Sequence, residues 1–199
     1  MRRSPALLLV AIATSCCSGA QPSTGYTLRL QTDVDAGGGL VIINVSTSLA
    51  PLGAAHLRSL VEDHFYDGAA FFRVVPKFVV QFGIAGTPAE NKKWQTAIVD
   101  DPVVGSNVEG TVTYATAGPN TRTTQLFINL GDNQRLDAQG FAPFGRVVQG
   151  IEIIRAISNP TPGKSGGVDQ NAYTEKGDAW IRKAYPMINF ILNATLAAQ

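Results

Sequence analysis

One arginine in the sequence has uncharged polar and aromatic residues close to it and again further along the chain. The arginine is Arg73, and its companions are Phe78, Gln81, Gln125 and Phe127. Their side chains supply hydrogen-bond donors, acceptors and apolar surface, but no nucleophile. The HExxH pattern of zinc proteases is absent, and neither histidine has an evident serine or cysteine partner. The sequence therefore gives little support to covalent or metal chemistry.

The two histidines and an acidic pair have structural interpretations that we favour over catalytic ones. His56 and His64 are eight residues apart on a predicted helix, whereas metal ligation would need closer spacing and a carboxylate partner. We expect both histidines to be packed or at the rim of the core. Asp100 and Asp101 precede Pro102, a setting in which acidic residues usually cap or turn a loop.

The composition is that of a soluble globular protein. The chain has 199 residues, of which 45% are apolar and 16% charged, so it is long enough to bury a core without disulfides. Lysine and arginine number 16 against 15 acidic residues, a net charge of +1. Without a strong overall field, nucleic acid is not an expected partner.

The first twenty residues have the three regions of a secretory signal peptide. Arg2 and Arg3 precede an apolar run at residues 6–13, and small residues follow at 18–20. The run is shorter than the roughly 20 residues of a membrane-spanning helix, so a stable membrane span is not expected. Cleavage would leave residues 21–199 as one domain, in the secretory pathway and then an extracellular or periplasm-like compartment.

Both cysteines, Cys16 and Cys17, lie inside this predicted signal. The cleaved chain would therefore have neither a disulfide nor a thiolate metal site. Lipid anchoring at Cys16 is disfavoured, because Ala13 stands where lipoprotein signals usually carry a large aliphatic residue.

The pattern of the remaining chain predicts many strands and few helices. Alternation and β-branched residues predict strands, whereas the apolar period after Pro51 predicts a helix to about Tyr66, and a second helix is expected at 151–157. This pattern predicts a mostly antiparallel barrel or sandwich with helical caps. A short amphipathic segment at 173–182 is expected to pack on it. The predicted strands are residues 26–31, 40–45, 71–75, 78–82, 110–115, 125–130, 144–148 and 188–192.

Three ordered blocks of the sequence carry a family resemblance. The first, at 71–83, reads Phe-Phe-Arg-Val-Val-Pro-Lys-Phe-Val-Val-Gln-Phe-Gly; the second lies at 115–128, and the third at 136–147. In these blocks and their spacing the chain resembles the cyclophilins, whose signature is Phe-x-Arg-Val/Ile-Ile/Val-Pro-x-Phe-x-x-Gln-x-Gly. The resemblance covers residues 26–157, with 188–192 as a closing strand.

The resemblance implies an eight-stranded antiparallel closed β-barrel capped by two α-helices, and peptidyl-prolyl cis-trans isomerase activity that needs no cofactor. Isomerisation breaks no covalent bond, and its barrier is about 18–20 kcal/mol. The twisted transition state has a lone pair on the prolyl nitrogen, which a fixed donor would stabilise. By resemblance, Arg73 is that donor and Gln81 acts with it. The implied substrate-binding residues are Phe78, Val79, Ala115, Thr116, Gln125, Phe127, Leu136 and Phe141.

Three departures from the family pattern bear on this expectation. Val79 stands where methionine is common and is a smaller pocket wall. Arg135 stands where a tryptophan that binds cyclosporin is frequent, so weak cyclosporin binding is expected. An insertion places Phe141 near the position of a family histidine.

Proline-containing peptides and unfolded or flexible protein segments are the expected partners, and a monomer is expected. A second hypothesis is a catalytically weak peptide-binding or scaffolding module, which Val79, Arg135 and Phe141 favour. A third is a purely structural barrel, in which the aromatic residues fill the core and Arg73 forms a surface ion pair. Convergence of Arg73 with Gln81 and Gln125 on one groove would separate the first two hypotheses from the third.

Overall fold

The computed structural model describes residues 25–34 and 39–198, so the predicted signal peptide lies outside the described residues. Within them, eight strands form one sheet in the order β3-β4-β6-β5-β7-β2-β1-β8, with antiparallel pairing throughout. The strands are β1 (Gly25–Thr32), β2 (Leu40–Ser46), β3 (Arg73–Val75), β4 (Val79–Phe82), β5 (Thr111–Tyr114), β6 (Leu126–Asn129), β7 (Pro143–Gln149) and β8 (Ile191–Ala198).

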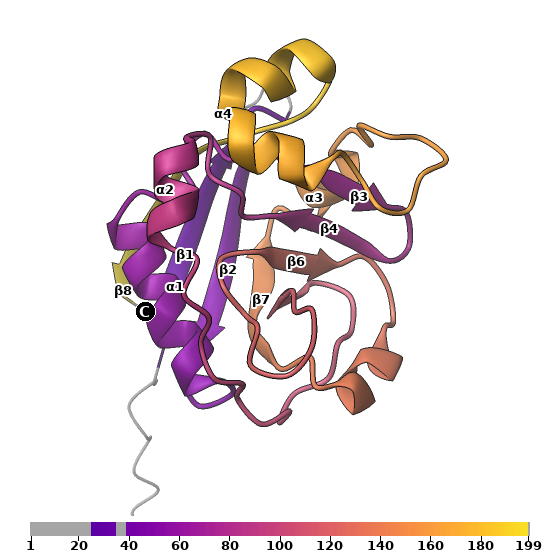
Figure 1. The fold of residues 1–199 in the computed structure, drawn as a ribbon. Coiled ribbons are helices and arrows are strands. Elements are labelled where there is room, and N and C mark those ends of the chain that lie inside the picture. The colour runs from indigo at the N-terminus through magenta and orange to yellow at the C-terminus, as the bar shows by residue number, and fades with distance from the viewer. Residues whose placement is uncertain (1–24, 35–38, 199) are drawn as a thin grey trace, which may run out of the picture.

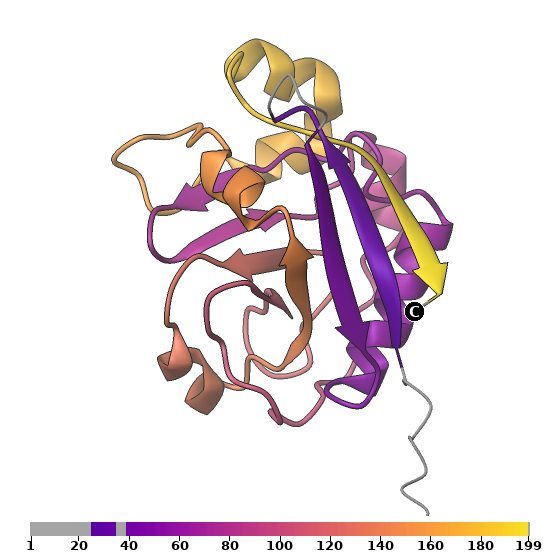
Figure 2. The same ribbon diagram turned by 180° about the vertical axis from the view of Figure 1, so that it is seen from behind.

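The sheet is curled, with β1, β2 and β8 steeply inclined to β3, β4 and β6 (Figures 1 and 2). The prediction of a mostly β fold with eight antiparallel strands is confirmed. The edge strands β3 and β8 do not form a ladder with each other. Instead, an isolated bridge between Ala70 and Phe190 joins the segments that precede them.

The described residues contain more helix than the sequence indicates. The two predicted helices are α1 (Pro51–Glu62) and α3 (Ile151–Ala156), and α4 (Gln170–Ala184) includes the predicted amphipathic segment. Two further elements, α2 (Pro88–Lys93) and the 3₁₀ helix η1 (Gln134–Gln139), have six residues each. They were not predicted, because the sequences of α2 and η1 contain too few apolar residues to show a helical period, whereas α3, of the same length, is rich in isoleucine.

The predicted boundaries of the closing strand are wrong. β8 begins at Ile191 and runs to Ala198, whereas the prediction placed it at 188–192. Ile188 lies in a turn, where its N–H donates to the Tyr185 carbonyl at 3.0 Å. The true strand contains several alanines, a residue that is depleted in strands, so composition did not reveal its extent.

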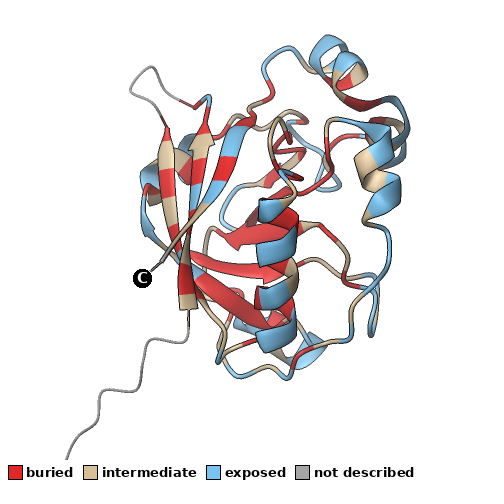
Figure 3. Ribbon diagram, turned by 90° about the vertical axis from the view of Figure 1, so that its left-hand side faces the viewer, coloured by how far each residue is buried: buried red, intermediate tan, exposed pale blue. Residues whose placement is uncertain are grey.

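The two larger apolar clusters hold the sheet, α1 and the C-terminal region together. The main core packs the buried side of α1, including Leu57, Leu60 and Val61, against the inner face of the sheet. A second cluster joins Phe72 to Val168, Tyr173 and other residues of the C-terminal region. Buried residues are concentrated on the strands, whereas α4 buries only Tyr173, Gly177 and Ile181 (Figure 3). None of the described helices is long and apolar enough for a membrane span.

Candidate active site

Three of the predicted site residues lie in one row across neighbouring strands. Arg73 on β3 is paired with Gln81 on β4, which is paired in turn with Phe127 on β6. Directly opposed residues of antiparallel strands point to the same face of a sheet. The next residues, Val74, Val80 and Ile128, are also register partners, and they lie in the main core. Strand alternation therefore directs the valines and isoleucine inward and the row of Arg73 outward.

A chain of hydrogen bonds orients the arginine. Arg73 Nη1 donates to Gln81 Oε1 at 2.9 Å, and Gln81 Nε2 donates to Gln125 Oε1 at 2.8 Å. From the other side, Arg73 Nε donates to the main-chain oxygen of Ser165 at 2.6 Å. Because a guanidinium can only donate, it determines which end of the Gln81 amide faces it.

The charge of Arg73 is only partly hydrated and has no ion-pair partner among the described residues. Partial burial lowers the pKa of Arg73, although arginine stays protonated at any physiological pH. Its acceptors are neutral, so the positive potential remains directed at whatever enters the adjacent cavity. This arrangement does not match the surface ion pair of the purely structural hypothesis.

The adjacent cavity has a volume of about 300 Å³ and brings together nine of the ten predicted site residues. Gln125, the tenth, lines a neighbouring cavity of about 340 Å³ that shares Gln81, Ala115 and Thr116 with the first. The nine are Arg73, Phe78, Val79, Gln81, Ala115, Thr116, Phe127, Leu136 and Phe141. The arginine and both glutamines thus converge on one groove.

The apolar wall of this cavity is separate from the main core. Val79, Phe127 and Leu136 form their own buried cluster, with exposed fractions of 1%, 4% and 6%. Phe141 packs on Phe127 with ring centroids 5.7 Å apart in an edge-to-face arrangement. The structural hypothesis requires these residues to fill the barrel interior, and they do not.

A buried polar network supports this wall from behind. Asn107 donates through Nδ2 to Asp137 Oδ1 and to the Phe141 carbonyl, both at 2.8 Å, and Asn133 donates to the Phe78 carbonyl at 2.8 Å. Burial raises the pKa of Asp137, but hydrogen bonds from Ser106 and Asn107 outweigh it and hold the pKa below its ordinary value. The carboxylate therefore stays ionised and fixes η1.

Phe78 is presented by a tight turn at the end of the β3–β4 hairpin. Lys77 has a left-handed backbone with φ 62°, and the Phe78 N–H donates to the Val75 carbonyl at 3.0 Å. The guanidinium carbons of Arg135 and Arg73 lie 4.8 and 5.6 Å from the Phe78 ring centroid. The cavity rim is therefore cationic at Arg135, one of the positions that depart from the family pattern.

The residues near the site that were not predicted from sequence include Gln139, Gln170 and Ser165, together with Ala117, Thr121 and Thr123 of the neighbouring cavity. Gln139 of η1 lines the apolar cavity, and Gln170, the first residue of α4, lines the neighbouring one. Ser165 contributes a main-chain carbonyl, so its side-chain type carries no signal. Residues 163–167 do have Gly-x-Ser-x-Gly spacing, but they form a loop rather than the strand–turn–helix of a hydrolase elbow.

The histidines and the acidic pair have other partners. His56 Nε2 bonds to the Thr123 carbonyl at 2.8 Å, and His64 lies exposed beside Asp67. Asp101 is buried and accepts from the Leu52 and Gly53 N–H groups at 3.0 and 2.8 Å, so it caps the N-terminus of α1. The described residues contain no cluster of three His, Cys, Asp or Glu side chains suited to a metal ion.

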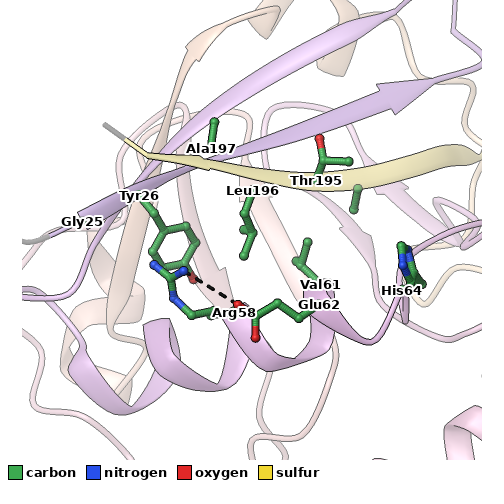
Figure 4. A pocket seen from close by; sticks show the side chains of 10 residues that line it. Gly25, Tyr26, Arg58, Val61, Glu62, His64, Thr195, Leu196 and Ala197 are labelled. Atoms are coloured by element: carbon green, nitrogen blue, oxygen red, sulfur yellow. Dashed lines mark ion pairs between the residues drawn. The ribbon is translucent and has the colours of Figure 1, made fainter.

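A larger cavity of about 520 Å³ lies between α1 and β8 (Figure 4). Arg58 and Glu62 of α1 form an ion pair in it at 3.8 Å, and Leu196 of β8 lines the opposite side. No site residue predicted from sequence lines this cavity.

Comparisons with known proteins agree with this geometry. A family model described as cyclophilin type peptidyl-prolyl cis-trans isomerase/CLD matches residues 27–180. A peptidyl-prolyl cis-trans isomerase of Acinetobacter baylyi is 34% identical over 139 residues, which cover 67% of this chain and 73% of the relative. One from Schizosaccharomyces pombe is 33% identical over 137 residues, covering 65% of this chain and 83% of the relative.

A solved structure of a cyclophilin type peptidyl-prolyl cis-trans isomerase from Cryptosporidium parvum shares the fold. The TM-score is 0.65 at 19% identity, and the match covers 88% of this chain and 99% of the other. With the family model spanning most of the described sheet and the arginine–glutamine groove in place, the chain belongs to the cyclophilin-type peptidyl-prolyl cis-trans isomerase family.

Proposed function

We propose that the isomerase activity of this chain is carried by Arg73 acting on an X-Pro bond held in the 300 Å³ cavity. The observation that supports this most strongly is the placement of an uncompensated guanidinium at the edge of an apolar cavity. Arg73 is held there by the neutral acceptors Gln81 and Ser165. Its two Nη2 hydrogens make no hydrogen bond within the described residues and remain available to substrate.

The proline ring would occupy the apolar part of the cavity, against Val79, Phe127, Leu136 and Phe141. Rotation of the X-Pro bond removes amide resonance, and the prolyl nitrogen gains a lone pair. A donor already aimed at that nitrogen stabilises the twisted state more than either planar state, and that difference accelerates the reaction. Main-chain groups of Ala115 and Thr116, with Gln125, would hydrogen-bond the peptide along the groove.

The test is prolyl isomerisation of short X-Pro peptides by residues 21–199, followed by exchange NMR so that no coupled protease is needed. Arg73→Ala is expected to lower the rate by roughly 10- to 1,000-fold, the range seen when one preorganised donor is removed. Arg155→Ala is the matched control, because Arg155 is exposed and pairs with Glu109 away from the cavity. Equal rates for Arg73→Ala and the parent would refute the proposed role.

A slow peptide-binding module is the second candidate. It is favoured by Val79, which leaves the cavity wider than a methionine would, and by Arg135 on its rim. Titrating the same proline peptides into the protein, alongside the NMR isomerisation assay, distinguishes it, since peptide binding without acceleration would support the module.

We also propose that cyclosporin binds weakly, because Arg135 replaces an indole donor. We further expect the protein to be a monomer that acts on flexible proline-containing segments.

We further propose that residues 1–20 direct the chain into a secretory pathway and that residues 21–199 act as one domain outside the cytosol. The support is the order of Arg2 and Arg3, the apolar run and the small residues in the sequence. Intact-mass measurement of the protein from cells and from the exported fraction tests this. An exported form that begins at Gln21 is expected, and an uncleaved intracellular form would contradict the proposal.

A further inference from the structure

We infer that residues 161–168, called here the Arg73 loop, are a positioning element that sets the orientation of the Arg73 guanidinium. The inference rests on the proposed role of Arg73. The loop joins α3 to α4 and passes beside β3 (Figure 1). Because β3 is an edge strand of the sheet, its outer side is open to this segment.

The Arg73 loop contacts β3 at two main-chain points. The Val168 N–H donates to the Phe72 carbonyl at 3.0 Å, and the Ser165 carbonyl accepts from Arg73 Nε at 2.6 Å. The second bond joins residues 92 positions apart. One segment of the C-terminal region therefore binds both the strand that carries Arg73 and the side chain itself.

Gly167 allows this close approach. A Cβ atom at Gly167 would lie 2.6 Å from both Arg73 Cβ and the Phe72 carbonyl oxygen, and 3.0 Å from Arg73 Cα. The backbone of Gly167 also has φ +78°, a conformation that strains other residues. At Gly166, by contrast, an added Cβ would meet nothing within 4 Å. The loop is thus tightly fitted to Arg73 at one residue and open at its neighbour.

Both ends of the Arg73 loop are anchored, although residues 162–166 are exposed. At the C-terminal end, Val168 is 4% exposed in the cluster with Phe72, and Asp169 caps α4 by accepting from the Ala172 N–H at 3.0 Å. At the other end, the Thr161 N–H donates to Asn159 Oδ1 at 2.9 Å. The segment that carries the Ser165 carbonyl is therefore held at both ends.

The consequence follows from the geometry of a guanidinium, whose five N–H groups lie in one plane. Ser165 restrains Arg73 at Nε, and Gln81 restrains it at Nη1. Two acceptors on different nitrogens define the plane of the group, whereas one would leave it free to rotate. Since displacement of a catalytic group by about 1 Å can cost roughly 100-fold in rate, loss of the Ser165 restraint should act on turnover.

The test compares Gly167→Ala with Gly166→Ala in the proteolysis-free NMR assay. Gly167→Ala should push the loop off Arg73 and lower kcat by roughly 10-fold or more, while the Kd of a proline peptide changes by less than about 3-fold. Gly166→Ala should match the parent in both. Full kcat in Gly167→Ala, with activity lost in Arg73→Ala, would overturn the inference and leave the proposed function standing. Full activity in Arg73→Ala would instead remove the proposed function.

Two further measurements separate positioning from a general structural effect. In the Arg73→Ala background, Gly167→Ala should lower the rate no further, and an equal loss in both backgrounds would overturn the inference. In the unaltered protein, the Arg73 Nε–H should exchange slowly with solvent, which needs no variant that might misfold. An Nε–H that exchanges as fast as that of Arg29, which is exposed on β1, would also overturn it.

Discussion

Gln81 lies directly across the β3–β4 hairpin from Arg73, and its amide oxygen accepts a hydrogen bond of 2.9 Å from Nη1 while its amide nitrogen donates to Gln125. Gln81 is therefore the central member of the hydrogen-bond chain, both acceptor and donor. Its amide can fill both roles, whereas a carboxylate can only accept.

Gln81→Glu is accordingly expected to lower kcat by roughly 10-fold or more. The new carboxylate would draw the guanidinium into an ion pair and would face the Gln125 oxygen without a proton between them. Gln125→Glu is the matched control, because it adds the same charge to the groove yet keeps the acceptor that Gln81 needs. Similar kcat values for the two variants would show that added charge, rather than the direction of the Gln81 amide, matters.

Val79→Met should tighten binding of proline peptides by filling part of the cavity. Val79 is 1% exposed and packs with Phe127 and Leu136, and each additional buried methylene contributes about 0.8 kcal/mol. An NMR titration would measure the Kd. Val80→Met is the control on the opposite face of the same strand, where overpacking the core should cost about 1–3 kcal/mol of stability with little effect on Kd. A weaker Kd in Val79→Met would contradict the expectation.

Arg135→Trp should strengthen cyclosporin binding at least several-fold. The change restores an indole donor at the rim of the cavity, where the Arg135 guanidinium now lies 4.8 Å from the Phe78 ring centroid. Arg135→Gln removes the same charge without adding an indole and serves as the control. Isothermal titration with cyclosporin measures the difference, and equal affinities for the two variants would argue against the assigned position.

The stability of the protein should fall as the pH drops through the ordinary pKa of histidine, in part because of His56. Burial holds the pKa of His56 below its ordinary value of 6.5, so the folded state takes up this proton less readily than the unfolded state. The unfolding free energy therefore decreases as pH falls below about 6.5, until His56 is protonated in the folded state as well. Urea unfolding at several pH values should show that the unfolding free energy depends less steeply on pH in His56→Gln than in the parent. His64→Asn is the control, since its exposed left-handed position suits asparagine.

Asp101→Ala should destabilise the protein by about 3–5 kcal/mol in urea unfolding. Asp101 caps α1 and accepts from Arg122 Nη1 at 3.1 Å, so its removal leaves a buried arginine, only 4% exposed, with an incomplete partner set. Asp100→Ala should cost less, because that carboxylate is about a third exposed. A loss in Asp101→Ala no larger than that in Asp100→Ala would contradict the capping role.

The sequence by itself was sufficient for the sheet, apart from the extent of β8, and for most of the groove. Strand alternation in residues 73–82 determines that Arg73 and Gln81 share one face while Val74 and Val80 share the other, because successive side chains of a strand point to opposite faces. The three motif blocks named the residues that line the apolar cavity. Both inferences depend only on local pattern and side-chain type.

Only the tertiary structure decided what holds the arginine from its second side. Ser165 contributes a main-chain carbonyl, which every residue possesses, so no side-chain pattern marks it. Asp101 caps a helix whose bonded residues lie 48 and 49 positions earlier, and Gln170 reaches the groove from the C-terminal region. These contacts depend on how distant segments pack together, and that packing is decided by the whole fold rather than by local sequence.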